Sequence, residues 1–207
     1  MHLVIDTSSE KGIAMVYSDQ AILSVKHFHV GKGAKEELVD VVRALLEELN
    51  ASSRDLKTLF AGMGPGSYTG IRVGVMFAKA LGFALGIPFK GFCSLGALVP
   101  SIDEGRFAGL IDARSGGVYL QLGERRGHRV LREDAPCRMK LEEAIDLLKG
   151  VPHLVATRTD RLMERFEEVT PSSVWSWEET QPDPTTLHQL CLLAAEGSNG
   201  LQEILYL

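Results

Sequence analysis

The sequence has only three cysteines, and no two of them form a Cys-x-x-Cys pair. This scarcity favours a reduced, cytoplasmic compartment, in which Cys93, Cys137 and Cys191 are expected to be buried free thiols. The first residues also lack the basic start of a signal peptide, and the chain turns polar at Asp6. We therefore expect no signal peptide.

Neither sign of charge is in large excess. The net charge is −5 and the isoelectric point is about 5.7, which argues against a broad nucleic-acid-binding surface acting alone. A basic cluster at residues 125–132 is best interpreted as a solvated hairpin tip, with a weak tRNA contact as the alternative. The longest apolar stretch is interrupted by Lys79 and is shorter than the roughly 20 residues that cross a bilayer, so we expect no membrane span.

Several motifs that carry chemistry are missing. No Gly-x-x-x-x-Gly-Lys-Ser/Thr or Gly-x-Gly-x-x-Gly sequence is present, Ser67 is not in a nucleophile elbow, and no His-x-x-x-His pair occurs. His27 and His29 point to one face of a predicted strand, but no third metal ligand lies nearby. A solvated strand face is therefore favoured over a metal site. The sequence predicts no catalytic residue, no metal and no cofactor.

The most distinctive segment is the glycine-rich run at residues 64–74, which follows the apolar strand predicted at 59–61. A glycine-rich turn between a strand and a helix brings backbone close to a ligand or a packed neighbour. Ser67 and Thr69 are good N-cap residues, so the helix should begin here. The predicted loop comprises Gly64, Pro65, Gly66, Ser67, Thr69 and Gly70.

The helix after the loop has small residues at every fourth position, namely Gly70, Gly74, Ala78, Gly82 and Gly86. This spacing forms one ridge of small side chains, whose cost in helix propensity is usually offset by close approach of another helix. The other faces are apolar, which predicts burial on all sides. Two interpretations stay open: a central core helix, or a helix partly covered by another protein chain.

A second long helix is predicted at residues 35–50. Val39 and Leu46 widen its apolar arc to about 160°, more than the usual stripe, so this helix should have two neighbours. The two helices together have more apolar surface than the chain can easily cover, which indicates a protein interface. The residues expected to contact a partner are Leu38, Val39, Val42, Leu45, Leu46, Met76, Phe77 and Ala80.

The two halves of the chain repeat one plan of strand, aspartate, turn, two strands, helix, strand and helix. The sequence thus predicts an α/β fold of two duplicated lobes, with an N-terminal lobe at residues 1–104 and a reduced C-terminal lobe at 105–207. A helix at 185–196 is placed in the second lobe, and residues 172–184 are expected to form an irregular surface loop.

Asp6 and Asp112 hold the same place in the two halves, each at the end of a strand. Such aspartates could hold a metal and phosphate in a cleft between the lobes. The alternative is that each one caps the turn that follows it, which aspartate does well. The absence of evident Gly-x-Thr/Ser phosphate hairpins favours the capping role.

Three segments, at residues 5–8, 64–72 and 111–119, resemble in sequence, order and spacing the bacterial TsaB (YeaZ) family. This resemblance implies an actin/hexokinase/Hsp70-type fold of two ribonuclease-H-like lobes. It also implies a non-catalytic partner of TsaD, the enzyme that acts with TsaE and TsaC to install N6-threonylcarbamoyladenosine in tRNAs that read codons beginning with A. A homodimer in isolation and contact with TsaE through TsaD are further expectations.

The sequence departs from that family at Gly117, where a glutamate is usual, and at residues 31–35, where a histidine is common. No basic tail follows Tyr206 and Leu207, so tRNA is expected to be contacted only indirectly. A rival function, from a different class, is an ATPase or metal-dependent hydrolase that uses Asp6 and Asp112. The missing phosphate hairpins and metal ligands count against this rival.

Overall fold

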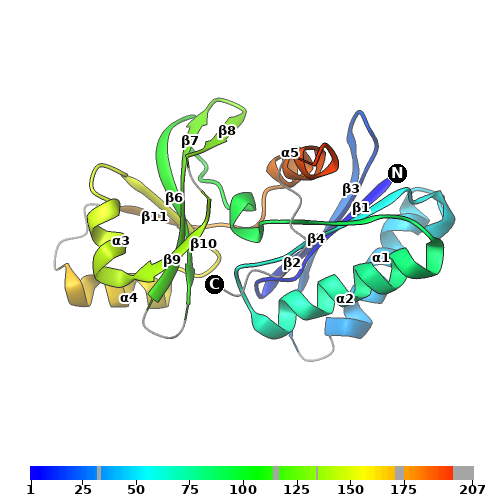
Figure 1. The fold of residues 1–207 in the computed structure, drawn as a ribbon, viewed down its shortest axis with the longest axis horizontal. Coiled ribbons are helices and arrows are strands. Elements are labelled where there is room, and N and C mark those ends of the chain that lie inside the picture. The colour runs from blue at the N-terminus through cyan, green and yellow to red at the C-terminus, as the bar shows by residue number, and fades with distance from the viewer. Residues whose placement is uncertain (32–33, 114–116, 134, 171–174, 198–207) are drawn as a thin grey trace. The chain divides into compact units, whose positions relative to one another are not determined.

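The computed structural model describes residues 1–31, 34–113, 117–133, 135–170 and 175–197, and the chain divides into two compact units. The first unit contains Met1–Ser94 and the segment that starts at Pro184, and the second contains Leu95–Asp183. Figure 1 shows both units, and each is described here by itself.

The first unit is built on a five-stranded sheet with the strand order β3-β2-β1-β4-β5. The strands β1, β2 and β3 are antiparallel, whereas β1, β4 and β5 run parallel. Its elements are β1 (His2–Asp6), β2 (Lys11–Tyr17), β3 (Ile22–His29), α1 (Ala34–Glu48), a 3-10 turn (Ser53–Asp55), β4 (Thr58–Gly62), α2 (Tyr68–Leu85), β5 (Phe89–Phe92) and α5 (Pro184–Ala195).

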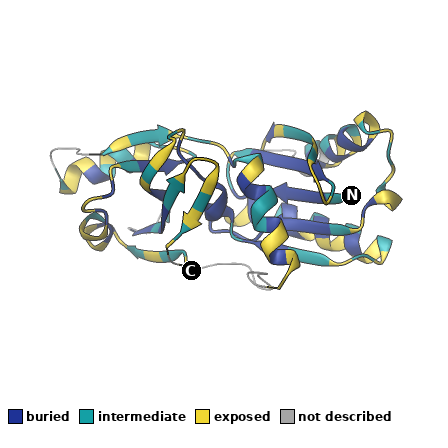
Figure 2. Cartoon of the chain, turned by 90° about the horizontal axis from the view of Figure 1, so that it is seen from above, coloured by how far each residue is buried: buried dark blue, intermediate teal, exposed yellow. Residues whose placement is uncertain are grey.

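Helices cover both faces of this sheet (Figure 1). Because side chains alternate along a strand, Leu3 and Ile5 of β1 point toward α1 and α2 and enter an apolar core, while His2, Val4 and Asp6 point to the other face. The second face is covered by α5, which buries Leu187, Cys191 and Ala194. Figure 2 shows that the central strands β1, β2 and β4 are almost wholly buried, whereas the edge strand β3 is mostly intermediate or exposed.

Helix α2 begins where the sequence predicts. The Ser67 hydroxyl accepts a hydrogen bond from the Gly70 amide, and the helix ends at Gly86 with a φ of 66°. Four members of the ridge are buried and Gly86 is exposed. The close neighbours of Gly70 and Gly74 are β1 and the turn after it, and those of Gly82 are Leu59 of β4 and Ile87, instead of a second helix. The expectation of burial on all sides was also wrong, because α2 covers only one face of the sheet and leaves its outer side exposed.

The second unit is built on a six-stranded sheet with the order β11-β10-β6-β7-β8, and β9 also pairs with β7. This order repeats that of the first sheet, which confirms the predicted α/β class and duplication. Its elements are β6 (Glu104–Asp112), β7 (Gly117–Arg126), β8 (Arg129–Arg132), β9 (Cys137–Lys140), α3 (Leu141–Leu147), β10 (His153–Ala156), α4 (Asp160–Val169) and β11 (Ser176–Glu179), preceded by a 3-10 turn (Ser94–Ala97).

Two sequence-based assignments are corrected by the structure. The unit boundary falls after Ser94 instead of at 104/105, and the last helix, α5, belongs to the first unit instead of the second. Residues 176–179 form β11, which pairs in parallel with β10, although we expected an irregular loop there. Local patterning indicates a helix or strand, but it does not indicate which sheet the element joins.

Candidate functional site

The glycine-rich loop packs on the turn that follows β1. The Ser67 amide donates to the Ser8 carbonyl oxygen (2.6 Å), and the Thr7 hydroxyl donates to the Gly70 carbonyl oxygen (2.7 Å). A Cβ atom at Gly70 would lie 2.1 Å from the Thr7 carbonyl oxygen, and one at Gly66 would lie 2.3 Å from that of Ser8. The glycines therefore allow two backbone segments of this chain to touch.

The rest of the loop is also engaged within the first unit. The Gly64 amide donates to the Ser94 hydroxyl (3.2 Å), and the Ser94 amide donates to the Gly64 carbonyl oxygen (2.8 Å). Pro65 is buried, whereas Thr69 is exposed. A phosphate cradle needs backbone amides that are directed at the ligand. Here the Gly64 and Ser67 amides bind other parts of the chain, so the loop serves packing.

Asp6 is 1% exposed at the end of β1. Its Oδ1 accepts a hydrogen bond from the Ser8 amide (2.8 Å), which is the turn-capping role. Its Oδ2 is buried near the Ser94 hydroxyl but has no well-aligned donor among the described residues. Burial raises the pKa of Asp6, and hydrogen bonds from Ser8 and Ser94 oppose that rise only in part.

Asp112 ends β6 in the second unit and has a different environment. Its Oδ1 lies 2.5 Å from Nη1 of Arg165, and its Oδ2 lies 3.1 Å from Nε of Arg161. Nη1 of Arg165 also donates to the Gly117 carbonyl oxygen (3.2 Å). The sequence did not indicate these partners, which come from α4. Residues 114–116 of the same motif lie outside the described residues, as do residues 32–33 and 205–207.

The histidine pair on β3 lies on one face, as predicted, and both side chains are exposed. Partial burial lowers the pKa of His27. Within the described ranges, no group of three or more His, Cys, Asp and Glu side chains is arranged to hold a metal ion. The sequence-based expectation that the chain binds no metal stays a prediction.

The outer face of α2 exposes large apolar side chains. Phe83 is 92% exposed, Met76 is 62% exposed and Tyr68 is 55% exposed, and Ala80 lies exposed between the first two. These residues recur at intervals of three, four and eight, so they form one stripe along the helix. We name this set, Tyr68, Met76, Ala80 and Phe83, the α2 stripe.

The two charged residues of α2 are both positive. The Arg72 guanidinium carbon lies 3.8 Å from the centre of the Tyr68 ring, and the Lys79 ammonium lies 5.4 Å from that of Phe89. No acidic residue occurs in α2. Among the helices of the described residues, α2 is the one long and apolar enough to cross a membrane (mean hydropathy 1.2), a test that core helices of soluble proteins also pass.

Of the eight helix residues expected to contact a partner, four lie in the core instead. They are at most 8% exposed and pack between α1 and the sheet; they are Leu38, Val42, Leu45 and Leu46. Val39, Met76 and Ala80 are exposed, and Phe77 is half-buried against the same core. Sequence reasoning missed Phe83 and Tyr68, although their spacing from Met76 could have identified both.

Comparisons with known proteins give consistent results. A family model described as "TsaD: tRNA N6-adenosine threonylcarbamoyltransferase" matches residues 29–167. The tRNA threonylcarbamoyladenosine biosynthesis protein TsaB of Bacillus subtilis is 35% identical over 123 residues, which are 58% of this chain and 53% of that protein. The protein of the same name from Escherichia coli is 29% identical over 122 residues, which are 56% of this chain and 52% of that protein.

The chain thus spans about half the length of the curated relatives that it matches. Among solved structures, YeaZ from Pseudomonas aeruginosa superposes with a TM-score of 0.79 at 22% identity, over 100% of this chain and 99% of that one. This likeness shows the fold, and it confirms the predicted duplicated, ribonuclease-H-like architecture of the actin type.

Proposed function

The chain belongs to the TsaD family, and within it to the TsaB (YeaZ) group, and from this premise we propose that it is a non-catalytic subunit in tRNA threonylcarbamoyladenosine biosynthesis. In this role it binds and supports a TsaD-type threonylcarbamoyltransferase, contacts TsaE through that enzyme, and contacts tRNA only indirectly. It acts in the cytoplasm, and it forms a homodimer when the enzyme is absent.

The observation that supports this role is the α2 stripe. Large apolar side chains that line up on one exposed helix face, with Phe83 92% and Met76 62% exposed, are unusual unless another surface covers them. Aromatic residues and methionine are also enriched where proteins meet. Val39 of α1, which is 42% exposed, adds a neighbouring contact.

The two aspartate turns support the non-catalytic part of the proposal. Asp6 is buried and caps its own turn, and Asp112 is paired with Arg161 and Arg165. A carboxylate that binds metal and phosphate needs oxygens that are open to the ligand. Neither carboxylate is available in this way without a rearrangement of its neighbours.

The experiment measures the affinity of this chain for the TsaD-type enzyme of the same organism by calorimetry. Phe83→Asp should weaken binding at least about thirtyfold, or about 2 kcal/mol, because it places a charge at the centre of an apolar contact. Leu147→Asp is the matched control, since Leu147 is a 43% exposed helix residue of the second unit. Circular dichroism checks that both variants fold.

If Phe83→Asp binds the enzyme as tightly as the unaltered chain does, the α2 stripe is not the contact surface. Nucleotide turnover tests the rival enzyme function separately. The isolated chain should hydrolyse neither ATP nor peptides, because no general base and nucleophile are assembled at either turn. ATP turnover that disappears in Asp6→Asn, in a preparation without the TsaD-type enzyme, would establish the rival.

A further inference from the structure

The two faces of the first sheet differ in chemistry. The face under α1 and α2 buries an apolar core, whereas the face under α5 buries groups that can gain or lose a proton. His188 of α5 lies over this second face, with its ring centre 4.6 Å from that of Tyr17 on β2. Tyr17 is 1% exposed and in turn stacks on His2 of β1, at 4.8 Å between ring centres.

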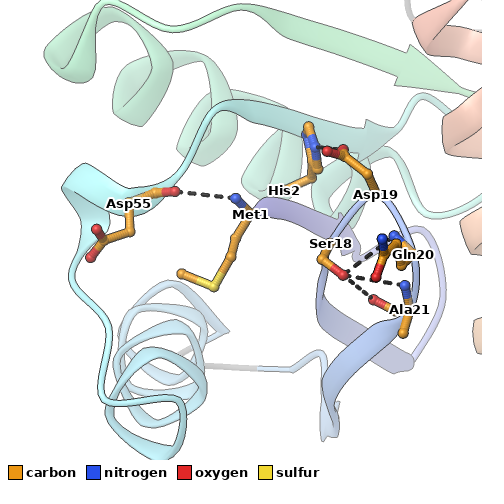
Figure 3. A network of polar contacts seen from close by, with 7 residues as sticks. All are labelled: Met1, His2, Ser18, Asp19, Gln20, Ala21 and Asp55. Atoms are coloured by element: carbon orange, nitrogen blue, oxygen red, sulfur yellow. Dashed lines mark hydrogen bonds and ion pairs between the residues drawn. The ribbon is translucent and has the colours of Figure 1, made fainter.

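Figure 3 shows His2 beside Asp19, and the neighbouring Met1 beside Asp55. Nε2 of His2 lies 3.0 Å from Oδ1 of Asp19, in the turn between β2 and β3, and the preceding Met1 amine donates to the Asp55 carbonyl oxygen. The turn that positions Asp19 is closed by hydrogen bonds to the Ser18 hydroxyl. These contacts place His2 beside Tyr17, whose ring also contacts His188.

Both imidazoles have one nitrogen without a hydrogen-bond partner among the described residues. These atoms are Nε2 of His188 and Nδ1 of His2, and both are buried. A protonated imidazole donates through both nitrogens, so a charged His188 would bury an N–H group with no acceptor. Burial, and after it the charge of His2, lower the pKa of His188.

Other ionisable groups on this face do not provide the missing acceptor. Burial raises the pKa of Tyr17 and of Cys191, which keeps the phenol and the thiol neutral. Asp19 is engaged with His2, and Asp6 caps its own turn. The remaining charged or titratable groups on this face are Lys11 of β2, His27 and His29 of β3, and Lys90 of β5. In register, His27 pairs with Ile13 and His29 pairs with Lys11, toward the end of β2 that lies away from Tyr17. Lys90 donates to the carbonyl oxygens of Ala194 and Ala195.

We propose that α5 is a proton-controlled latch, which is docked on the first sheet while His188 is neutral and is released when His188 takes up a proton. The chain leaves the first unit after Ser94 and returns to it at Pro184, so α5 provides the second connection between the units. Release of α5 undoes the second of these chain connections and leaves the one at Ser94. Acidification therefore frees α5 from the first sheet.

The direction of the pH effect follows from the lowered pKa of His188. Docking is fully favourable above the ordinary histidine pKa of about 6.5, and it weakens as the pH falls below that value. If only the released form takes up the proton, the ratio of released to docked α5 rises about tenfold between pH 7.5 and pH 5.5. This prediction does not depend on the proposed function.

Hydrogen exchange of the full chain, corrected for the intrinsic effect of pH, measures this ratio for peptides that cover α5. We expect α5 to lose about tenfold in protection between pH 7.5 and pH 5.5 while α1 keeps its protection. His188→Phe keeps a ring over Tyr17 but cannot be protonated, so it should abolish the response. His188→Gln provides the same test if the phenylalanine variant does not fold.

Two controls separate the latch from general loosening. Lys90→Met removes the contact at the other end of α5, so it should lower the protection of α5 at both pH values and leave the response to pH unchanged. His153→Gln, in the second unit, should change nothing in α5. The proposal is wrong if the protection of α5 is independent of pH in the unaltered chain, or if the response persists in both His188 variants.

Discussion

Asp6 ends β1 in the first unit, and Asp112 ends β6 in the second. In each unit one helix contacts the turn that follows this aspartate: α2 in the first unit and α4 in the second. In the first unit, α2 holds the turn through close backbone contact, because Gly70 and Gly74 let the helix approach Thr7. In the second unit, α4 holds the turn through charge, because Arg161 and Arg165 bind Asp112.

The two units place an aspartate at the same point of the fold but surround its carboxylate with different groups. With a close steric contact beside it, Asp6 is enclosed, and burial raises its pKa. With two cations beside it, Asp112 forms ion pairs and keeps 17% of its side chain exposed. Neither arrangement leaves a carboxylate with both oxygens open to a ligand.

The largest expected effect comes from adding a side chain where α2 packs against the turn after β1. In Gly70→Ala, the new Cβ atom would lie 2.1 Å from the Thr7 carbonyl oxygen, so α2 or the turn must move. We expect a loss of about 3 kcal/mol or more in the free energy of unfolding, measured by urea denaturation. Gly74→Ala should cost less, since its Cβ atom would lie 2.4 Å from the Thr7 hydroxyl, a side-chain atom that can rotate.

Gly82→Ala is the matched control on the same helix. Its Cβ atom would lie 3.1 Å from the Ile87 carbonyl oxygen, a mild contact that is offset by the roughly 1 kcal/mol that alanine adds in helix propensity. Its stability should therefore stay within about 1 kcal/mol of that of the unaltered chain. If all three variants were equally stable, the ridge would not be in close contact with β1 and its turn.

The second effect tests the charged contact of the second unit. Asp112→Ala should cost about 2 kcal/mol, because Arg165 is only 18% exposed and loses a charged partner. In a double-mutant cycle of Asp112→Ala with Arg165→Met, the interaction energy between the two residues should account for most of this loss in stability. The same cycle with Arg161→Met should give less than about 1 kcal/mol, because Arg161 is 58% exposed and solvent weakens the pair.

The fold was largely readable from the sequence because its local signals agree. Hydrophobic periodicity, the glycine-rich run and the Ser67 cap predicted β4, the loop and α2 within a few residues. The repeated plan predicted two related α/β lobes, and the structure has two sheets with the same strand order. These features depend on neighbours along the chain, which a sequence pattern records directly.

The remaining features depend on partners far apart along the chain. The ion pair between Asp112 and Arg165 joins residues 53 positions apart, and no local pattern connects them. The apolar arc of α1 was interpreted as surplus surface, but Leu46 and Val42 are covered by the sheet and only Val39 is exposed. Periodicity gives the width of an apolar arc; it does not tell how much of that arc the same chain covers.

A smaller loss of stability is expected when the N-cap of α2 is removed, because this cap fixes the start of the helix beside the turn after β1. Ser67→Ala removes the acceptor of the Gly70 amide and should cost about 1 kcal/mol in thermal or urea unfolding. Thr69→Ala is the control, because Thr69 is exposed inside the first turn and is not the cap. An equal loss in both variants would mean that the cap assignment is wrong.

The smallest effect is the one that distinguishes the two aspartates most clearly, because it should change with pH. Asp6→Asn keeps an oxygen to accept from the Ser8 amide and removes the buried charge. The pKa of Asp6 is raised in the folded state, so the folded chain binds a proton more tightly than the unfolded chain does. The unaltered chain therefore loses stability as the pH rises above about 4, and the asparagine variant avoids that loss.

At pH 4 the two chains should be about equally stable, and at pH 8 Asp6→Asn should be more stable by less than about 1 kcal/mol. Urea denaturation at a series of pH values measures the difference. Asp112→Asn is the control from the other unit: it weakens an ion pair, so it should be destabilising at pH 8. If Asp6→Asn were also destabilising at pH 8, the charged form of Asp6 would be favoured by a partner, and the contrast between the two turns would not hold.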